Sequence, residues 1–128
     1  MIDKKYVAYE GQRFTVEWYL DGQGKSKARE YFEELPLDRK KKLKHLMQTI
    51  GDYGQIHSEE KFRNEGDKIY AFKPSPDRFL CFFSVGSKVI ITNAFEKKTD
   101  KLPPREKDRA LKYRFDYLQR NKEGKYYG

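Results

Sequence analysis

Polar and apolar positions alternate strictly in one early segment of the chain. Between residues 14 and 20 every second side chain is apolar, and the positions between them carry Thr15, Glu17 and Tyr19. The apolar members are Phe14, Val16, Trp18 and Leu20. A period of two places alternate side chains on opposite faces of an extended chain, so the pattern predicts a half-buried β-strand. The polar and glycine residues that follow it predict a turn.

Two segments after this strand carry apolar residues at the spacing of a helix. In each segment they fall at i, i+3, i+4 and i+7, which places them on one face. They are Ala28, Tyr31, Phe32 and Leu35 in the first segment, and Leu43, Leu46, Met47 and Ile50 in the second. Ser26 can cap the first helix, Pro36 stops it, and Gly51 is placed to end the second. Residues 26–51 are therefore predicted to form a helical hairpin with one apolar side.

Three short segments rich in aromatic and β-branched residues follow a polar loop at 52–67. They span residues 68–73, 78–85 and 88–95, and residues typical of turns separate them. This arrangement predicts a three-stranded meander. The second and third segments are nearly continuous apolar runs, which is typical of central strands covered on both faces.

A final helix is predicted to begin at Pro103 and Pro104, because proline is tolerated in the first turn of a helix. We expect Leu111, Phe115 and Leu118 to pack inward on this helix. A different face carries the basic side chains of Arg105, Arg109, Lys112 and Arg120.

These elements predict one α+β domain over residues 1–128, with its core at residues 14–118. The expected architecture is a small, mainly antiparallel sheet with an N-terminal helical hairpin packed on one side and a C-terminal helix at the end. A chain of 128 residues is long enough to bury a core without metals or disulfides. Residues 121–128 are expected to form a frayed tail.

The single cysteine and the length of the apolar runs limit the class of protein. Cys81 lies in the apolar run from Phe79 to Phe83, so we expect a buried thiol rather than a nucleophile or half of a disulfide. The first ten residues lack the apolar segment of a signal peptide, and no stretch reaches the roughly 18 consecutive apolar residues of a membrane span. We therefore expect a cytoplasmic protein without a membrane partner.

Positive charge is concentrated near the end of the chain. The net charge is +8, and 38% of the residues are charged. From residue 97 onward there are 11 Lys and Arg residues against 5 Asp and Glu residues, so this last quarter supplies +6 of the total. Lys97, Lys98 and Lys101 lie where the last strand gives way to the last helix. Such a cluster favours a polyanion as partner.

Local motifs stand at three places in the meander and in the junction that follows it. They are Lys68-Ile69-Tyr70, Arg78-Phe79-Leu80, and Phe95-Glu96-Lys97-Lys98-Thr99 followed by Leu102, Pro103, Glu106 and Ala110. The order of strand, helical hairpin, meander, basic elbow and helix, together with these motifs, resembles the RelE/ParE toxin superfamily. The local sequence is most similar to its HigB branch, including the phage-derived Gp49-like members, over residues 14–118.

The resemblance implies a RelE-like fold and the toxin half of a type II toxin–antitoxin pair. Members of the superfamily typically cleave mRNA, often on the ribosome, and do so without a metal or another cofactor. The resemblance therefore implies mRNA, ribosomal RNA and a cognate antitoxin as partners. It also implies assembly either as a homo-oligomer or as a toxin–antitoxin hetero-oligomer.

RNA cleavage without a metal needs a base, cations for the crowded phosphate and an acid for the leaving 5′-oxygen. Arg78 suits the phosphate because its guanidinium is planar and always charged, and it matches a commonly catalytic arginine of the superfamily. The alternative is a turn arginine paired with Asp77 or with an acidic residue of the surface. Lys73, Lys97 and Lys98 are the next candidates, either as bases among crowded cations or as contacts that only hold the RNA backbone. For Lys97 and Lys98 the second role is favoured.

Further candidates lie in the loop before the meander, on its first strand and on the last helix. His57 occupies a place from which some HigB-like proteins supply a histidine, and imidazole suits acid–base work near neutral pH, although a solvated loop residue is the favoured alternative. Tyr70 is expected to stack on a base, to polarise the 2′-hydroxyl or to pack in the core as a cross-strand aromatic residue. The candidates for electrostatic contact with RNA are Lys101, Arg105, Arg109 and Lys112.

Other kinds of site find little support in the sequence. Two histidines and one cysteine do not make a zinc site, and no glycine-rich phosphate loop carries the required Lys and Ser or Thr. Two alternative functions remain open. The first is a non-enzymatic, ParE-like inhibitor of DNA gyrase, and the second is a phage-type nucleic-acid-binding protein without catalytic activity.

Overall fold

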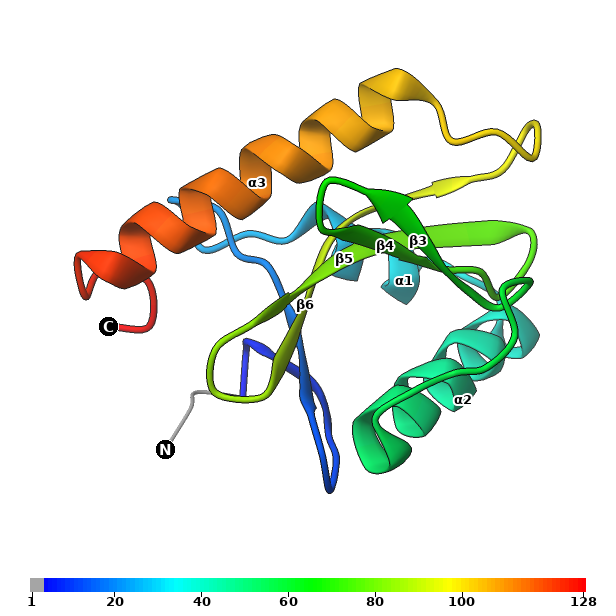
Figure 1. Cartoon of the computed structure of the whole chain (residues 1–128), viewed down its shortest axis with the longest axis horizontal. Coiled ribbons are helices and arrows are strands. Elements are labelled where there is room, and N and C mark those ends of the chain that lie inside the picture. Colours follow the sequence, from blue (N-terminus) through cyan, green and yellow to red (C-terminus); the bar gives the residue numbers. More distant parts are fainter. Residues whose placement is uncertain (1–3) are drawn as a thin grey trace.

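A six-stranded sheet forms the centre of the computed structural model, which describes residues 4–128 (Figure 1). Residues 1–3 of the predicted domain lie outside this described part. The strands are β1 (Val7–Glu10), β2 (Thr15–Trp18), β3 (Phe62–Gly66), β4 (Ile69–Phe72), β5 (Asp77–Ser84) and β6 (Lys88–Glu96). Their order across the sheet is β1-β2-β6-β5-β4-β3, and only the pair β2 and β6 is parallel. The protein is therefore an α+β protein with a mostly antiparallel open sheet.

The structure contains three helices in its described part, and local signals set their ends. They are α1 (Lys27–Glu33), α2 (Leu37–Tyr53) and α3 (Pro104–Lys122). Ser26 caps α1, because its hydroxyl accepts a hydrogen bond from the backbone N–H of Arg29 at 3.1 Å. Pro36 stands at the N-cap of α2. Gly54, in the left-handed region at φ 83°, ends α2, so the predicted end at Gly51 was three residues early.

Gly51 instead permits close packing between α2 and the β1–β2 hairpin. A Cβ atom at this position would lie 2.8 Å from the Tyr9 ring, which is too close for an ordinary contact. The carbonyl of Gly51 accepts hydrogen bonds from the backbone N–H groups of Arg13 at 2.7 Å and Phe14 at 2.9 Å. Glycine at this position therefore lets the helix approach the hairpin backbone.

Helices cover both faces of the central strands, as the apolar runs predict. On β5, Phe79 contacts Tyr31 of α1 and Trp18 of β2, at ring-centroid distances of 5.7 and 6.5 Å. Phe82 contacts Tyr117 of α3 at 5.4 Å. Side chains alternate along a strand, so residues 79 and 82 point to opposite faces. The sheet therefore has one apolar layer under α1 and another under α3.

Two edge strands were not predicted from the sequence. The strand β1 pairs with β2 ahead of the predicted core, and β3 pairs with β4 inside the stretch predicted as a polar loop. Neither strand has a buried residue in its burial pattern. Edge strands are held by backbone hydrogen bonds to one neighbour, so they need no hydrophobic period that a sequence pattern would reveal.

The C-terminal tail is packed, which corrects the prediction of a frayed end after residue 121. The helix α3 continues to Lys122, and Tyr126 is only 4% exposed. The Tyr126 hydroxyl accepts a hydrogen bond from the Leu20 N–H at 2.8 Å, and its carbonyl accepts one from the Tyr6 hydroxyl at 2.9 Å. The core therefore extends at both ends beyond the predicted range of 14–118. Aromatic residues spaced irregularly along a tail give no periodic signal.

The inward face of α3 also differs from the predicted one. Phe115 is 70% exposed and Leu118 is exposed as well, whereas the buried positions are Glu106, Ala110 and Tyr117. The small side chain of Ala110 and the Tyr117 ring fill the space against the sheet. Leu111 is partly buried and packs against the core as predicted, so the prediction was wrong for Phe115 and Leu118 only. The inward face of this helix combines small, aromatic and hydrogen-bonded side chains, which apolarity alone does not reveal.

A buried ion pair fixes the start of β5. The Asp77 carboxylate is fully buried and accepts hydrogen bonds from Arg39 of α2, with Nε at 3.0 Å and Nη2 at 2.5 Å. The Tyr31 hydroxyl of α1 donates to the same carboxylate at 2.5 Å. Arg39 also reaches Glu96 at the end of β6, at 3.0 Å. Burial, followed by the bond to Asp77, raises the pKa of Tyr31, which therefore stays a neutral donor. Three elements thus meet at the Asp77 carboxylate, and Arg39 joins the end of β6 to them.

Replacement of Tyr126 tests whether the tail belongs to the core. Tyr126→Ala should lower the free energy of unfolding by roughly 3–5 kcal/mol, because it removes a buried ring and leaves the Leu20 N–H without its partner. Urea denaturation followed by circular dichroism measures the change. Lys125→Ala, at the exposed neighbouring position, should stay within about 0.5 kcal/mol of the parent. Equal stability of the two variants would contradict the packed tail.

Replacement of Asp77 tests the ion pair at the start of β5. Asp77→Ala should lower the free energy of unfolding by roughly 3–5 kcal/mol, because breaking a buried pair leaves the other partner uncompensated. The same urea titration measures this loss. Glu10→Ala, which removes a carboxylate from an exposed position on β1, is the matched control and should change stability by no more than about 0.5 kcal/mol. A loss no larger than that of the control would show that the pair does not hold the strand.

Candidate functional site

A hollow of about 420 Å³ lies at one end of the sheet, where four segments of the chain meet. The loop before β3, the turn between β4 and β5, the start of β5 and the elbow after β6 contribute to it. Its lining residues are Glu60, Lys61, Lys73, Ser75, Arg78, Lys97 and Asp100. We call this hollow the basic cavity, because four of the seven residues are cationic. The predicted candidates Lys73, Arg78 and Lys97 thus come together.

Arg78 is the most buried cation of the basic cavity, with 8% of its surface exposed. Its Nη1 donates to the backbone carbonyl of Asp77 at 3.0 Å, and no carboxylate within residues 4–128 lies within ion-pair distance of it. Burial lowers the pKa of the guanidinium, and the nearby carboxylates of Asp100, Glu65 and Asp77 oppose that effect. The remaining N–H groups of Arg78 can therefore bind an anion in place of the water that burial removes.

The alternative of a turn arginine paired with the Asp77 carboxylate does not describe this geometry. Asp77 and Arg78 are adjacent on β5, so their side chains point to opposite faces of the sheet. The carboxylate is already bonded to Arg39 and Tyr31 on its own face. Arg78 therefore keeps its positive charge on the side of the cavity.

The lysines of the basic cavity differ in how they are held. Lys73 donates from Nζ to the Glu59 carbonyl at 3.3 Å, and Lys97 donates to Oδ1 of Asp100 at 2.6 Å. Lys61 is exposed, and within residues 4–128 its side chain has no hydrogen-bond or ion-pair partner. The bond from Lys97 and the charges of Arg78 and Lys73 lower the pKa of Asp100, so this carboxylate is ionised at neutral pH.

Three other predicted candidates lie outside the basic cavity. Lys98 is 83% exposed at its side chain and lies 3.6 Å from Glu96, so it points away from its neighbour Lys97. His57 is an exposed residue of the loop before β3 and does not line the cavity. Tyr70 stacks on Phe62 with ring centroids 5.5 Å apart.

The position of Tyr70 follows from the register of β4 and β5. Tyr70 pairs with Cys81, whereas Arg78 belongs to the alternate set of side chains on β5. The two therefore lie on opposite faces of the sheet. Phe83, on the same face as Tyr70, makes an edge contact with it at 5.0 Å. Tyr70 thus packs among aromatic side chains, as the core alternative predicts. The sheet separates its ring from Arg78.

A groove continues from the basic cavity toward the start of α3. A small hollow that shares Arg78 and Asp100 with the cavity leads to a second one of about 340 Å³. Lys101 lines both of these hollows, and Lys107 lines the second. The predicted contact residue Lys101 therefore lies next to the cavity.

The basic residues of α3 do not form one uniform outer face. Arg105 and Lys112 are exposed, and Arg109 lies 3.4 Å from Glu106. Arg120 instead donates to the Leu20 carbonyl at 2.5 Å and to Asp116 at 2.8 Å. Arg120 is therefore a structural anchor between α3 and the segment that follows β2, which corrects its assignment to the basic face of the helix.

Three residues of the basic cavity were not singled out from the sequence. Lys61 and Glu60 lie in the stretch read as a polar loop, where charged residues are common and carry no signal. Asp100 follows Lys97 by three residues, and the ion pair between them was visible in the sequence only as opposite charges in an elbow. The folded chain, rather than the local pattern, brings these groups to Arg78.

Within residues 4–128, no group of three or more His, Cys, Asp or Glu side chains could hold a metal ion. No helix in the same range is long and apolar enough to cross a membrane. Cys81 is fully buried, and burial raises its thiol pKa, as expected for a core thiol.

Comparison with known proteins gives one family. The sequence model of the family described as "Phage derived protein Gp49-like" matches residues 30–114, about two thirds of the chain. The match includes all seven residues of the basic cavity. No curated protein matches the chain. The family is a RelE/HigB-like toxin family associated with toxin–antitoxin systems. The chain thus belongs to the phage-derived Gp49-like family.

Proposed function

We propose that this protein is the toxin of a type II toxin–antitoxin system and a metal-independent mRNA endoribonuclease of the HigB branch. One observation carries the proposal. Arg78, which lacks a carboxylate partner within residues 4–128, shares a cavity with Lys61, Lys73 and Lys97. A buried guanidinium among lysines is suited to a phosphodiester, whose charge increases during cleavage.

The proposed reaction is attack of an RNA 2′-oxygen on the adjacent phosphorus. The 2′-hydroxyl gives up its proton to water, and the new bond gives a 2′,3′-cyclic phosphate. The bond to the 5′-oxygen breaks, and that oxygen takes up a proton from water and leaves as a hydroxyl, so one proton is released and one is consumed. Arg78 binds a non-bridging oxygen of the phosphate through its planar N–H groups. Lys73 and Lys97 add positive charge around the same phosphate. Asp100 holds Lys97 in place through their 2.6 Å bond.

The partners follow from the charge of the surface near the cavity. Lys101, Arg105 and Lys112 are exposed along the elbow and α3, and we assign to them contact with ribosomal RNA during ribosome-dependent cleavage. An antitoxin with an acidic surface would cover the same region. The proposed site of action is the cytoplasm, where translated mRNA is present.

Replacement of Arg78 tests the proposed activity directly. Arg78→Ala should reduce cleavage of translated mRNA by about 10²- to 10³-fold, because one preorganised donor to the phosphate is lost. The rate is measured in a translating extract containing EDTA at a concentration that leaves ribosomal magnesium in place, with mRNA 5′ ends mapped by primer extension. Arg13→Ala is the matched control, because Arg13 is exposed and lies outside the basic cavity.

Three results would count against the proposal, the first from this experiment and the other two from separate experiments on the parent protein. Cleavage by Arg78→Ala at the rate of the parent would remove the catalytic role of Arg78. DNA breaks without codon-linked RNA cuts in cells expressing the parent would instead identify a gyrase inhibitor. Binding of RNA by the parent without any cleavage would identify a nucleic-acid-binding protein that has no catalytic activity.

The neighbouring lysines Lys97 and Lys98 provide a second test with a built-in control. Lys97→Gln should reduce the cleavage rate by about 10-fold or more, because it removes a cation from the cavity and releases Asp100. Lys98→Gln makes the same chemical change at the adjacent, outward-pointing side chain, and its rate should stay within about twofold of the parent. Single-turnover cleavage of one mRNA measures both rates. Equal losses would show that the elbow acts only through its total charge.

A further inference from the structure

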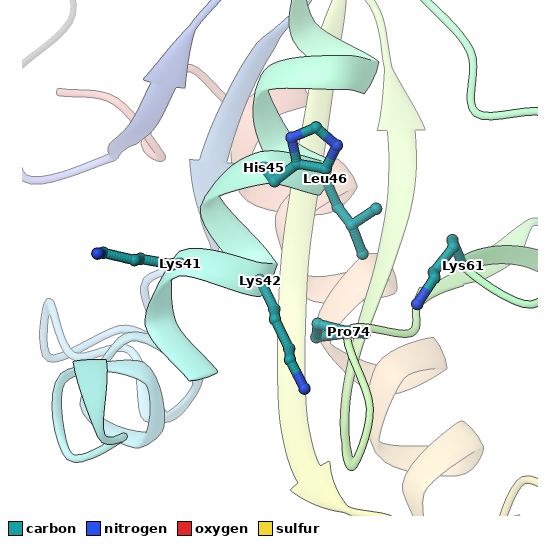
Figure 2. Close-up of a pocket in the computed structure, with 6 residues that line it drawn as sticks. All are labelled: Lys41, Lys42, His45, Leu46, Lys61 and Pro74. Carbon is teal, nitrogen blue, oxygen red and sulfur yellow. The ribbon is translucent and has the colours of Figure 1, made fainter. Parts of the chain in front are cut away.

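A second cavity, of about 330 Å³, lies between α2 and the turn that follows β4 (Figure 2). Its lining residues are Lys41, Lys42, His45, Leu46, Lys61 and Pro74. We call it the α2 cavity. In Figure 2, Lys42 and Lys61 approach Pro74 from α2 and from the opposite segment, whereas Lys41 extends away. Neither the sequence nor the proposed function gives a role to this place.

The lining of the α2 cavity combines cations with apolar surface. Unlike the basic cavity, it contains no Asp or Glu among its lining residues. Lys42 donates from Nζ to the Ser75 carbonyl at 3.4 Å, and within residues 4–128 neither Lys42 nor Lys61 is paired with a carboxylate. Leu46 and Pro74 are buried and supply apolar atoms, and the exposed His45 supplies an aromatic ring.

This combination fits a nucleotide better than a simple anion. The phosphate group needs positive charge and N–H donors, while the base and sugar offer flat or apolar surface. An acidic peptide would need the cations and would leave the aromatic ring and the apolar atoms without a matching group. The lining therefore favours one nucleotide unit over a carboxylate side chain.

The α2 cavity is next to the basic cavity and shares Lys61 with it. The turn between β4 and β5 separates them, with Pro74 on one side and its neighbours Lys73 and Ser75 on the other. A strand of RNA whose phosphate lies at Arg78 can thus continue past Lys61 into the α2 cavity. Lys61, without a partner within residues 4–128, is placed to contact the backbone between the two positions.

We propose that the α2 cavity is a subsite for a nucleotide flanking the cleaved bond in single-stranded RNA. Lys42 and Lys61 bind the backbone phosphate, and the base packs on the His45 ring with Leu46 and Pro74 beside it. This inference rests on the proposed function for the identity of the polymer. The subsite adds a second place of contact with the RNA, besides the basic cavity. The protein therefore recognises a stretch of RNA longer than the cleaved dinucleotide.

The test measures binding to RNA that cannot be cleaved, separately from catalysis. Fluorescein-labelled, fully 2′-O-methylated oligonucleotides of two and six nucleotides are titrated with the full chain, and fluorescence anisotropy gives the affinities. The double variant Lys42→Gln/His45→Ala should bind the hexanucleotide about 10-fold more weakly than the parent, because a phosphate contact and a stacked base are lost. Its affinity for the dinucleotide should stay within about twofold, because that ligand fills only the basic cavity.

A matched control variant and the salt dependence of binding show whether the loss of affinity comes from the α2 cavity. Lys44→Gln/Gln48→Ala changes two exposed α2 residues outside the cavity, and we expect parental affinity for both oligonucleotides. The slope of log affinity against log salt for the hexanucleotide should fall by about 0.7 in the Lys42→Gln/His45→Ala variant, the value expected for one phosphate contact on a single strand. Thermal midpoints check that all variants are folded.

Every other outcome would contradict the subsite. The outcomes also distinguish failure of the subsite from failure of the proposed function. Failure of the parent to bind the hexanucleotide more tightly than the dinucleotide would remove the subsite, whereas the proposed function stands or falls with cleavage in the translating extract. Parental hexanucleotide binding by Lys42→Gln/His45→Ala, with weakened binding by Arg78→Ala, would remove the subsite alone. Equal weakening of the dinucleotide and the hexanucleotide would show a general charge effect. The double variant Lys42→Gln/His45→Ala is also titrated with a labelled decamer of glutamate. If it loses as much affinity for this peptide as for the hexanucleotide, or more, the α2 cavity would be assigned to an acidic protein partner.

Discussion

The ion pair between Arg39 and Asp77 determines how the functional end of this protein is built. It joins α2 to the start of β5, and the bonds from Tyr31 to Asp77 and from Arg39 to Glu96 add α1 and the end of β6. Because Asp77 is fully buried, its charge must be matched within the protein. The pair therefore positions the backbone of Arg78, the next residue, and directs the Arg78 side chain to the other face of the strand.

A second set of polar contacts positions the opposite wall of the groove. Asn93 of β6 donates from Nδ2 to the backbone carbonyl of Glu106 at 3.1 Å and to its Oε1 at 3.0 Å, which ties the first turn of α3 to the sheet. Lys97 continues the β6 backbone pairing by donating its N–H to the Pro76 carbonyl at 2.8 Å. The elbow from 97 to 103 is thus held at both ends, and the side chains of Lys97 and Asp100 are presented to Arg78 from a fixed frame.

Periodic burial was visible in the sequence, and contact between distant segments was not. The strand at 15–18 and the two helices of the hairpin follow from regular spacing of apolar residues. The three strands around Arg78 follow from apolar runs bounded by turn residues. The edge strands β1 and β3 and the Tyr126 tail depend on partners remote in sequence. The basic cavity likewise combines a residue that the sequence pattern reveals with one that only the folded chain brings to it. Arg78 followed from its strand and the family resemblance, but Lys61 reaches it only through the pairing of β3 with β4.

The distribution of carboxylates explains why positive charge remains at the two cavities. Asp77 is taken by Arg39, Glu96 by Arg39 and Lys98, and Glu106 by Asn93 and Arg109. Each of these acids stabilises the frame, and within residues 4–128 none of them forms an ion pair with Arg78, Lys61 or Lys42. Clustered cations repel one another and cost stability in the free protein. A polyanion that binds at the two cavities would supply the negative charge that the protein itself does not place beside these cations. The RNA of the proposed function would do so with one phosphate per nucleotide.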